Sequence, residues 1–261
     1  MAAYCSSSDY VKVNDKKVKL MKATINLFCL PFAGGNKYSY QKYIEKAPSF
    51  LNIIPLEYPG RGARMKESLI SDVDALVNDL YDQIKKNTNQ TEYAIYGHSM
   101  GGLIGYLVTR KLVENNHKQP LHLFITGTSG PSSASRSAKN RHLLPKDEFI
   151  QELKNLDGIP DEILQNEDLL SYIEPILRAD FKTCETYQYG DYPPLNIPLT
   201  VITGTDEDME IADIQLWQKE TECVVDFRQI PGKHFFIFKY PRVIVDIISK
   251  KLSVHTKAYQ L

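Results

Sequence analysis

The stretch Tyr93-Ala94-Ile95-Tyr96-Gly97-His98-Ser99-Met100-Gly101-Gly102 decides the fold of this chain. Its first four residues favour a strand, and the apolar run Leu103–Val113 that follows is long enough for a buried helix. A serine between a strand and a helix, in the pattern G-x-S-x-G, is typical of a nucleophile elbow. Gly97 and Gly101 would let the two backbones approach closely, and the helix start would offer unpaired N–H groups to an oxyanion. The alternative is a structural glycine turn, but the flanking strand and helix favour Ser99 as a nucleophile.

Strands and helices alternate along most of the 261 residues. We expect strands at Thr24–Leu30, Asn52–Glu57, Leu121–Thr126, Pro198–Thr203 and Val224–Ile230, and helices from Ser71, at Ile211–Trp217 and over residues 241–252. This alternation predicts an α/β fold with a mostly parallel, doubly wound sheet. Residues 23–252 are expected to form a single domain, preceded by a polar, Lys-rich extension (1–22) and followed by a short tail (253–261).

The pattern changes between about residues 136 and 190, where no strand is expected. Phe149, Leu153 and their neighbours form one apolar helical stripe, and Leu169–Phe181 forms another. Gly158-Ile159-Pro160 separates the two stripes. Such an insertion is too short for an ordinary independent domain, so we predict a helical lid over the catalytic face. A helical decoration without that function is the alternative.

Composition excludes several classes of protein. The net charge of −1 argues against a nucleic-acid or anionic-membrane partner held by bulk electrostatics. No apolar run has the length of a signal peptide core or a membrane span. The four cysteines show no C-x-x-C spacing, so neither a disulfide framework nor a cysteine metal site is indicated. A cytoplasmic enzyme is the expectation.

Ser99 is followed along the chain by an acid after one strand and a histidine after the next. Ser…Asp/Glu…His is the chain order of the α/β-hydrolase triad, in which histidine activates the serine and a carboxylate orients the histidine. Of six histidines, only His234 lies in a Gly-containing loop just after a late strand. The consecutive acids Asp206, Glu207 and Asp208 compete for the third place. We favour Asp206 as the acid of the triad, with Asp208 as the second choice. Glu207, which lies three residues after Gly204, remains a further candidate for this acid.

The loop after the first long strand, Pro31-Phe32-Ala33-Gly34-Gly35, consists largely of small residues. In an α/β-hydrolase, one oxyanion N–H comes from the residue after the nucleophile and another from a loop after an early strand. Met100 and Ala33 are therefore the candidate oxyanion donors. A simple turn is the alternative for the loop.

Several ordered motifs together resemble the stand-alone type II thioesterases of nonribosomal peptide and polyketide synthesis. They are Leu30–Gly35, Tyr58-Pro59-Gly60-Arg61-Gly62, Gly97–Gly102, Gly158-Ile159-Pro160, Leu177-Arg178-Ala179-Asp180-Phe181 and His234-Phe235-Phe236, and the resemblance spans Leu27 to about Leu252. Two features depart from the family pattern. The family often has Gly-Gly before the histidine, where this chain has Gly232-Lys233. The family's acid is usually an aspartate at a fixed position, and here Glu207 leaves open which residue occupies that position.

The resemblance implies an α/β-hydrolase with a helical lid that uses Ser99, an acid near residue 206 and His234. Its expected substrates are acyl, aminoacyl or peptidyl groups joined as thioesters to the phosphopantetheine arm of a carrier protein, with no metal or cofactor. Most family members clear mis-primed carrier domains, and a monomer is the default. The alternatives are chain release from a fatty-acyl carrier protein, a carboxylesterase or lipase, and a non-enzymatic scaffold that docks carrier proteins.

Overall fold

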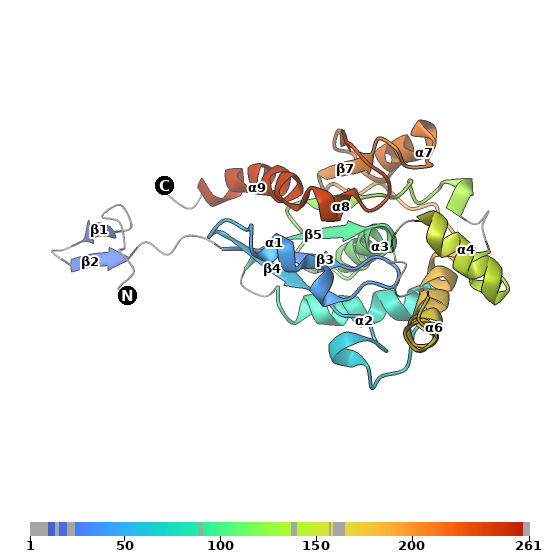
Figure 1. Ribbon diagram of the computed structural model, residues 1–261. Helices are drawn as coiled ribbons and strands as arrows, with labels where there is room; N and C mark the ends of the chain where they lie inside the picture. Colours follow the sequence, from blue (N-terminus) through green and yellow to red (C-terminus); the bar gives the residue numbers. More distant parts are fainter. Residues whose placement is uncertain are drawn as a thin grey trace.

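The computed structural model describes residues 10–13, 16–19, 24–88, 91–136, 140–156, 158 and 165–257. Six parallel strands form the central sheet, in the order β4-β3-β5-β6-β7-β8. Strands β3, β4 and β5 are seen together in Figure 1. These strands are β3 (Ile25–Leu30), β4 (Leu51–Pro55), β5 (Glu92–His98), β6 (Leu123–Thr126), β7 (Leu199–Gly204) and β8 (Asp226–Ile230). The reversal of strand order around β3 confirms the predicted doubly wound α/β-hydrolase fold.

Helices cover both faces of the sheet. On one face, α2 (Val73–Lys85), α3 (Met100–Glu114), α7 (Ile211–Gln215) and the 3-10 helix η6 (Leu216–Glu220) pack on strand residues such as Phe28 and Ile95. On the other face, η2 (Lys37–Tyr40), α1 (Gln41–Ile44), α8 (Phe236–Lys239) and α9 (Pro241–Lys257) pack on residues such as Leu27 and Tyr96. Because β3 and β5 are buried on both sides, their sequences are nearly continuous apolar runs.

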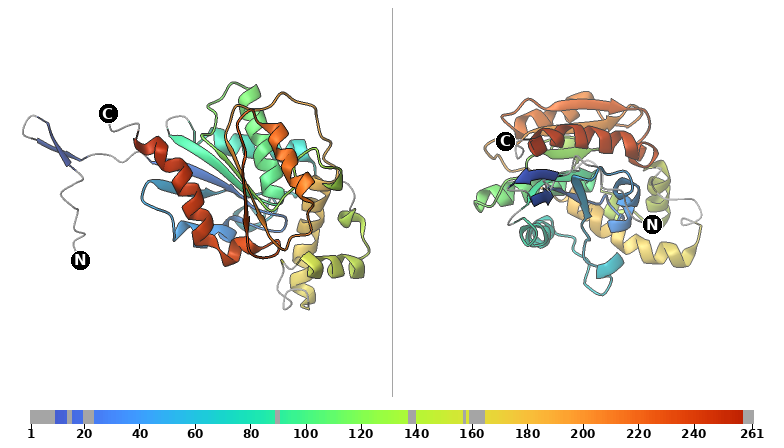
Figure 2. Two further views of the ribbon diagram at one scale, coloured as in Figure 1. Left: turned by 90° about the horizontal axis from the view of Figure 1, so that it is seen from above. Right: turned by 90° about the vertical axis from the view of Figure 1, so that its left-hand side faces the viewer.

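The described residues between β6 and β7 contain helices and no strand, as predicted. They form η4 (Ala134–Arg136), η5 (Arg141–Leu143), α4 (Lys146–Leu156) and α6 (Glu167–Glu185), and α4 and α6 lie together beside one end of the sheet (Figure 2). Phe149, Leu153, Leu170 and Leu177 form a small apolar core between these two helices. Ile159 and Pro160 of the predicted break lie outside the described residues.

Smaller elements lie outside the central sheet and its covering helices. Strands β1 (Tyr10–Val13) and β2 (Lys16–Lys19) form a separate antiparallel pair, and a short 3-10 helix, η3 (Gly62–Arg64), follows β4. The prediction that the last helix stops at 252 is wrong, because α9 continues to Lys257. Residues 253–257 contain no Gly or Pro that would end it. Among the described residues, no helix is long and apolar enough to cross a membrane.

Candidate active site

Ser99 lies at the turn between β5 and α3, at the carboxyl end of a central strand. Its backbone has φ +54° and ψ −117°, a strained conformation for a residue with a side chain; such strain costs about 1–3 kcal/mol and persists where the surroundings impose it. The Ser99 N–H donates to Thr126 O at 2.8 Å, which ties the turn to β6. The predicted nucleophile elbow is therefore present in the structure.

The glycines of the motif allow the close approach that the turn requires. A Cβ on Gly97 would lie 2.0 Å from Gly101 O, and a Cβ on Gly101 would lie 2.1 Å from Leu30 O. The second contact places the start of α3 against the end of β3, where the loop Pro31–Gly35 begins. The predicted oxyanion loop and the predicted nucleophile are thus neighbours.

His234 follows β8 and is held by a carboxylate from the loop after β7. Its Nδ1 lies 2.6 Å from Glu207 Oε1, and Glu207 Oε2 accepts the Gly204 N–H at 2.6 Å. The Glu207 side chain is 3% exposed, whereas the His234 side chain is 24% exposed. A carboxylate fixed by a backbone donor on one oxygen can orient an imidazole with the other.

The interpretation that favoured Asp206 as the partner of His234 is wrong. Asp206 is exposed, and its carboxylate accepts from the Thr205 hydroxyl at 3.0 Å. Asp208, the second choice, is exposed as well. The turn after Gly204 directs only the side chain of Glu207 back over the end of the strand. The spacing of three residues from this glycine was the signal in the sequence.

His98 connects the elbow with the His234 loop. The two imidazole rings are 4.8 Å apart between centroids, at 41°. Burial lowers the pKa of His98 well below its ordinary value, and the neighbouring His234 lowers it further, so His98 is neutral. Gly127 makes room for this arrangement, since a Cβ there would lie 2.4 Å from His98 Cε1 and 3.3 Å from Glu207 Oε1. Sequence analysis gave His98 no part in the site.

A buried chain of hydroxyl groups supports His98 from below. Thr126 Oγ1 lies 3.0 Å from His98 Nδ1 and 3.1 Å from the Tyr96 hydroxyl, which in turn lies 3.1 Å from the Tyr43 hydroxyl. All four side chains are buried. These side chains are therefore hydrogen-bonded to one another, whereas His98 Nε2 is buried without a partner among the described residues.

The candidate oxyanion donors Ala33 and Met100 have the hydrogen-bonding state that this role requires. Gly34 N–H donates to Asp180 Oδ2 at 2.7 Å and Gly35 N–H to Phe32 O at 2.9 Å. In the part of the chain that the structure describes, the N–H groups of Ala33 and Met100 donate to no acceptor. Met100 opens α3, where the positive end of the helix dipole lies.

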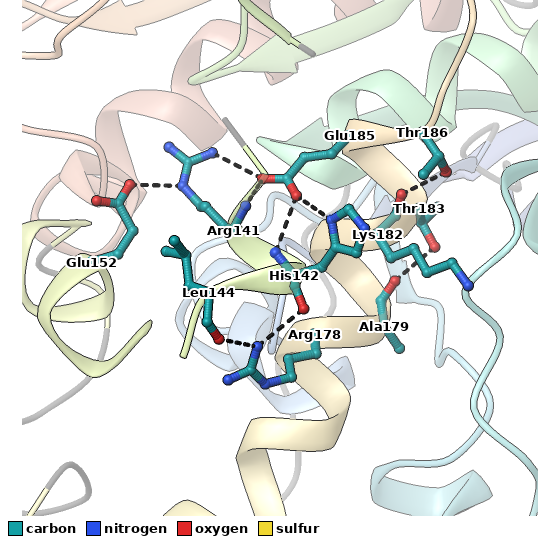
Figure 3. Close-up of polar contacts among 10 residues, drawn as sticks. All are labelled: Arg141, His142, Leu144, Glu152, Arg178, Ala179, Lys182, Thr183, Glu185 and Thr186. Carbon is teal, nitrogen blue, oxygen red and sulfur yellow. Dashed lines mark hydrogen bonds and ion pairs between the residues drawn. The ribbon is translucent and has the colours of Figure 1, made fainter. Parts of the chain in front are cut away.

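A polar cluster around Glu185 joins η5 to α6 (Figure 3). Glu185 Oε1 accepts the Arg141 N–H at 3.0 Å, and its Oε2 lies 2.7 Å from His142 Nδ1. Arg178 Nη1 donates to His142 O at 3.0 Å and to Leu144 O at 2.9 Å (Figure 3). These contacts fix η5 to α6, and they pair His142 with Glu185.

The insertion also approaches His234, the candidate catalytic histidine. Phe235 packs edge-on against His234, with ring centroids 5.0 Å apart. A Cβ on Gly158 would lie 2.0 Å from Phe235 Cε2, so Gly158 packs directly against this ring. One described residue of the insertion, Gly158, therefore contacts the loop that carries His234.

Comparison with known proteins shows the family to which this chain belongs. The sequence matches the family described as thioesterase domain over residues 25–252. It is 31% identical over 231 residues to the gramicidin S biosynthesis protein GrsT of Aneurinibacillus migulanus, covering 88% of this chain and 90% of that protein. It is 28% identical over 225 residues to the medium-chain S-acyl fatty acid synthase thioesterase of Homo sapiens, covering 83% of this chain and 82% of that one.

The fold is also similar to that of a solved structure. ClbQ from the colibactin NRPS/PKS pathway superimposes with a TM-score of 0.84 at 28% identity, covering 89% of this chain and 98% of that chain. The family match spans the whole sheet, the elbow and His234, which are the parts on which the α/β-hydrolase interpretation depends. The chain thus belongs to the thioesterase domain family and is a thioester hydrolase.

Proposed function

We propose that this chain is a serine thioesterase that hydrolyses acyl, aminoacyl or peptidyl thioesters on the phosphopantetheine arms of carrier proteins. Its role would be to clear mis-primed carrier domains in nonribosomal peptide or polyketide synthesis. The observation that carries the proposal is the His234–Glu207 pair, whose imidazole packs against His98, the residue before the strained Ser99. The similarity to GrsT and ClbQ supports the pathway class.

In the proposed mechanism, His234 takes the proton of Ser99 as Oγ attacks the thioester carbonyl. The N–H groups of Ala33 and Met100 stabilise the tetrahedral oxyanion, and the pantetheine thiolate leaves and takes the proton from the His234 imidazolium. Glu207 keeps the imidazole in the required tautomer and stabilises its cation. Water activated by His234 then hydrolyses the acyl-enzyme. Because a thiolate is a better leaving group than an amine, thioesters should react faster than amides. No metal or cofactor takes part.

The partner in this proposal is a carrier protein, and the enzyme acts in the cytoplasm as a monomer. Sedimentation or light scattering of the purified protein tests the monomer directly.

Turnover of carrier proteins loaded with acetyl, aminoacyl or long acyl groups tests the proposal, with Ser99→Ala as the control. Preference for acetyl or single aminoacyl groups, abolished in Ser99→Ala, supports a carrier-clearing enzyme. Unchanged hydrolysis in Ser99→Ala would remove Ser99 as the nucleophile. Oxyester hydrolysis without any carrier thioester hydrolysis would indicate a carboxylesterase or lipase instead.

A second candidate is release of medium or long acyl chains from a fatty-acyl carrier protein. The similarity to the human medium-chain thioesterase favours it. The same experiment separates the two functions, because a chain-release enzyme would prefer the long acyl groups.

A further inference from the structure

A buried ion pair joins the helical insertion to the catalytic half of the molecule. Arg61, in the loop after β4, donates through Nη1 to Asp180 Oδ2 at 2.5 Å and through Nη2 to Asp180 Oδ1 at 2.6 Å. The Arg61 and Asp180 side chains are only 4% and 1% exposed. Asp180 lies in α6, so a two-point contact fixes this helix to a loop 119 residues earlier in the chain.

The same ion pair holds the backbone of the oxyanion loop. Asp180 Oδ2 accepts the Gly34 N–H at 2.7 Å, and Arg61 Nη1 donates to Gly35 O at 3.4 Å. Two successive residues of the loop are therefore bound, one through its N–H and one through its carbonyl. Neither Ser99 nor His234 takes part in these contacts.

Packing restricts the loop further. Gly34 has φ +77°, and a Cβ there would lie 2.6 Å from Leu177 Cδ2, one turn before Asp180 on α6. The Tyr58 hydroxyl donates to Pro31 O at 2.7 Å, and the Arg61 guanidinium lies over the Tyr58 ring at 5.2 Å. The loop is thus held on one side by α6 and on the other by the segment that carries Arg61.

The consequence concerns the N–H groups of the loop. Because Asp180 occupies the Gly34 N–H and Phe32 O occupies the Gly35 N–H, the donor left for a ligand is the one on Ala33. Rotation of the Ala33–Gly34 peptide would break the bond to Asp180. The position of Asp180 therefore controls the orientation of the neighbouring backbone.

We propose that Asp180 is a positioning residue for the oxyanion hole: with Arg61, it holds the loop 33–35 in the conformation that leaves the Ala33 N–H free. The inference rests on the proposed function, since it needs Ala33 to bind the oxyanion. It also means that the part of α6 around Asp180 belongs to the catalytic framework and does not move as a lid.

Two double variants separate positioning from general stability. Arg61→Met/Asp180→Leu removes both charges and the acceptor of the Gly34 N–H. Arg61→Gln/Asp180→Asn also removes both charges, but its amide retains a carbonyl oxygen that can accept from Gly34. Replacing a buried ion pair by apolar groups is often tolerated, whereas removing one partner leaves an uncompensated charge, so double variants are the appropriate test.

Kinetics on acetyl- and long-acyl-loaded carrier proteins give the first readout, and thermal unfolding gives the second. We expect kcat of Arg61→Met/Asp180→Leu to fall about 10- to 100-fold, as for a misplaced catalytic group. The loss should be equal for both acyl groups and leave KM unchanged. Arg61→Gln/Asp180→Asn should recover most of the loss. This recovery would not occur if the pair served stability alone.

Three outcomes would overturn the inference. They are a wild-type kcat in Arg61→Met/Asp180→Leu, equal kcat losses in both double variants, and a loss confined to KM for one acyl group. If the apolar variant fails to fold, Arg61→Gln/Asp180→Asn decides: we expect its kcat to stay near that of the wild type even where its thermal stability falls, and a kcat loss of about tenfold or more counts against positioning.

Failure of the proposed function can be distinguished from failure of the Asp180 proposal. The wild-type chain would then leave carrier thioesters intact, and Ser99→Ala would show which residual oxyester activity belongs to this site. The Asp180 variants can be measured on that oxyester activity, because an ester also forms an oxyanion.

Discussion

Glu207 and His234 form a hydrogen bond of 2.6 Å between Oε1 and Nδ1, and the second oxygen of the same carboxylate is bound by the backbone of Gly204. The glutamate reaches the imidazole from the loop after β7, while the aspartates on either side of it are exposed. A fixed and buried carboxylate next to a partly exposed imidazole is the arrangement that an activated serine requires.

We expect Glu207→Gln to lower kcat for thioester hydrolysis by about 10³- to 10⁴-fold, because the amide favours the wrong histidine tautomer and cannot stabilise the cation. Asp206→Asn is the matched control and should stay within about twofold of the wild type, as expected for an exposed side chain. Steady-state kinetics on one acyl-carrier substrate check both. A large loss in Asp206→Asn alone would return Asp206 to the candidate acid.

Gly101→Ala should disrupt the elbow. Its Cβ would lie 2.1 Å from Leu30 O and 2.6 Å from Pro31 O, and backbone atoms cannot move aside as a side chain can. We expect inactivity and a loss of about 1–3 kcal/mol in the free energy of unfolding.

The control for Gly101→Ala is Gly105→Ala in the same helix, whose Cβ would meet Ile95 Cγ2 at 3.1 Å. It should change stability by less than about 1 kcal/mol, since alanine favours a helix over glycine. Denaturant unfolding compares the two variants. Equal effects would contradict the close approach of β3 to the elbow.

Thr126→Val should break the hydroxyl chain beneath His98. The substitution leaves His98 Nδ1 and the Tyr96 hydroxyl without the Thr126 hydroxyl that lies between them. We expect the free energy of unfolding to fall by about 1–3 kcal/mol, the cost of unsatisfied buried polar groups.

Thr109→Val is the control for Thr126→Val, because the Thr109 hydroxyl is equally buried but bonds only to Gly105 O, one turn back in its own helix. Its loss should cost less than about 1 kcal/mol. Chemical denaturation measures the free energy of unfolding of both variants. A larger loss in Thr109→Val than in Thr126→Val would show that the row of hydroxyl groups beneath His98 does not stabilise the fold.

Acidification should destabilise the fold through His122. Burial lowers the pKa of His122 to about 4, and the positive charges of Lys251 and His255 act in the same direction, against Asp226. In the unfolded chain this pKa lies at about 6.5. Between the two values only the unfolded chain binds the proton, so the free energy of unfolding falls as pH decreases from 7 to 4.5.

The His122 contribution to this fall is about 2–3 kcal/mol. Unfolding of His122→Gln at both pH values should show a fall smaller by that amount. The buried, neutral His98 acts in the same direction, so a remaining pH dependence is expected in the variant. An identical fall in wild type and variant would show that His122 is not the group responsible.

Much of the fold follows from local patterns in the sequence. Continuous apolar strands, amphipathic helices and their alternation specify a parallel sheet, and the glycines around Ser99 specify the elbow, because both depend on neighbours in the chain. The place of His234 after a late strand follows from the same order. The end of α9 was predicted five residues too early, at 252 instead of Lys257, since the sequence there lacks a clear stop signal.

Only the tertiary structure decided which acid contacts His234. In the sequence, only the spacing from Gly204 distinguishes Glu207 from the neighbouring aspartates. The direction of each side chain depends on how the turn after Gly204 folds against the His234 loop. The contacts of Asp180 with Arg61 and Gly34, and of His98 with His234, likewise join residues far apart in the chain. The sequence by itself determined the elements and their chemical groups. The tertiary structure decided which groups meet, because a contact between distant segments depends on packing of the whole sheet and its helices.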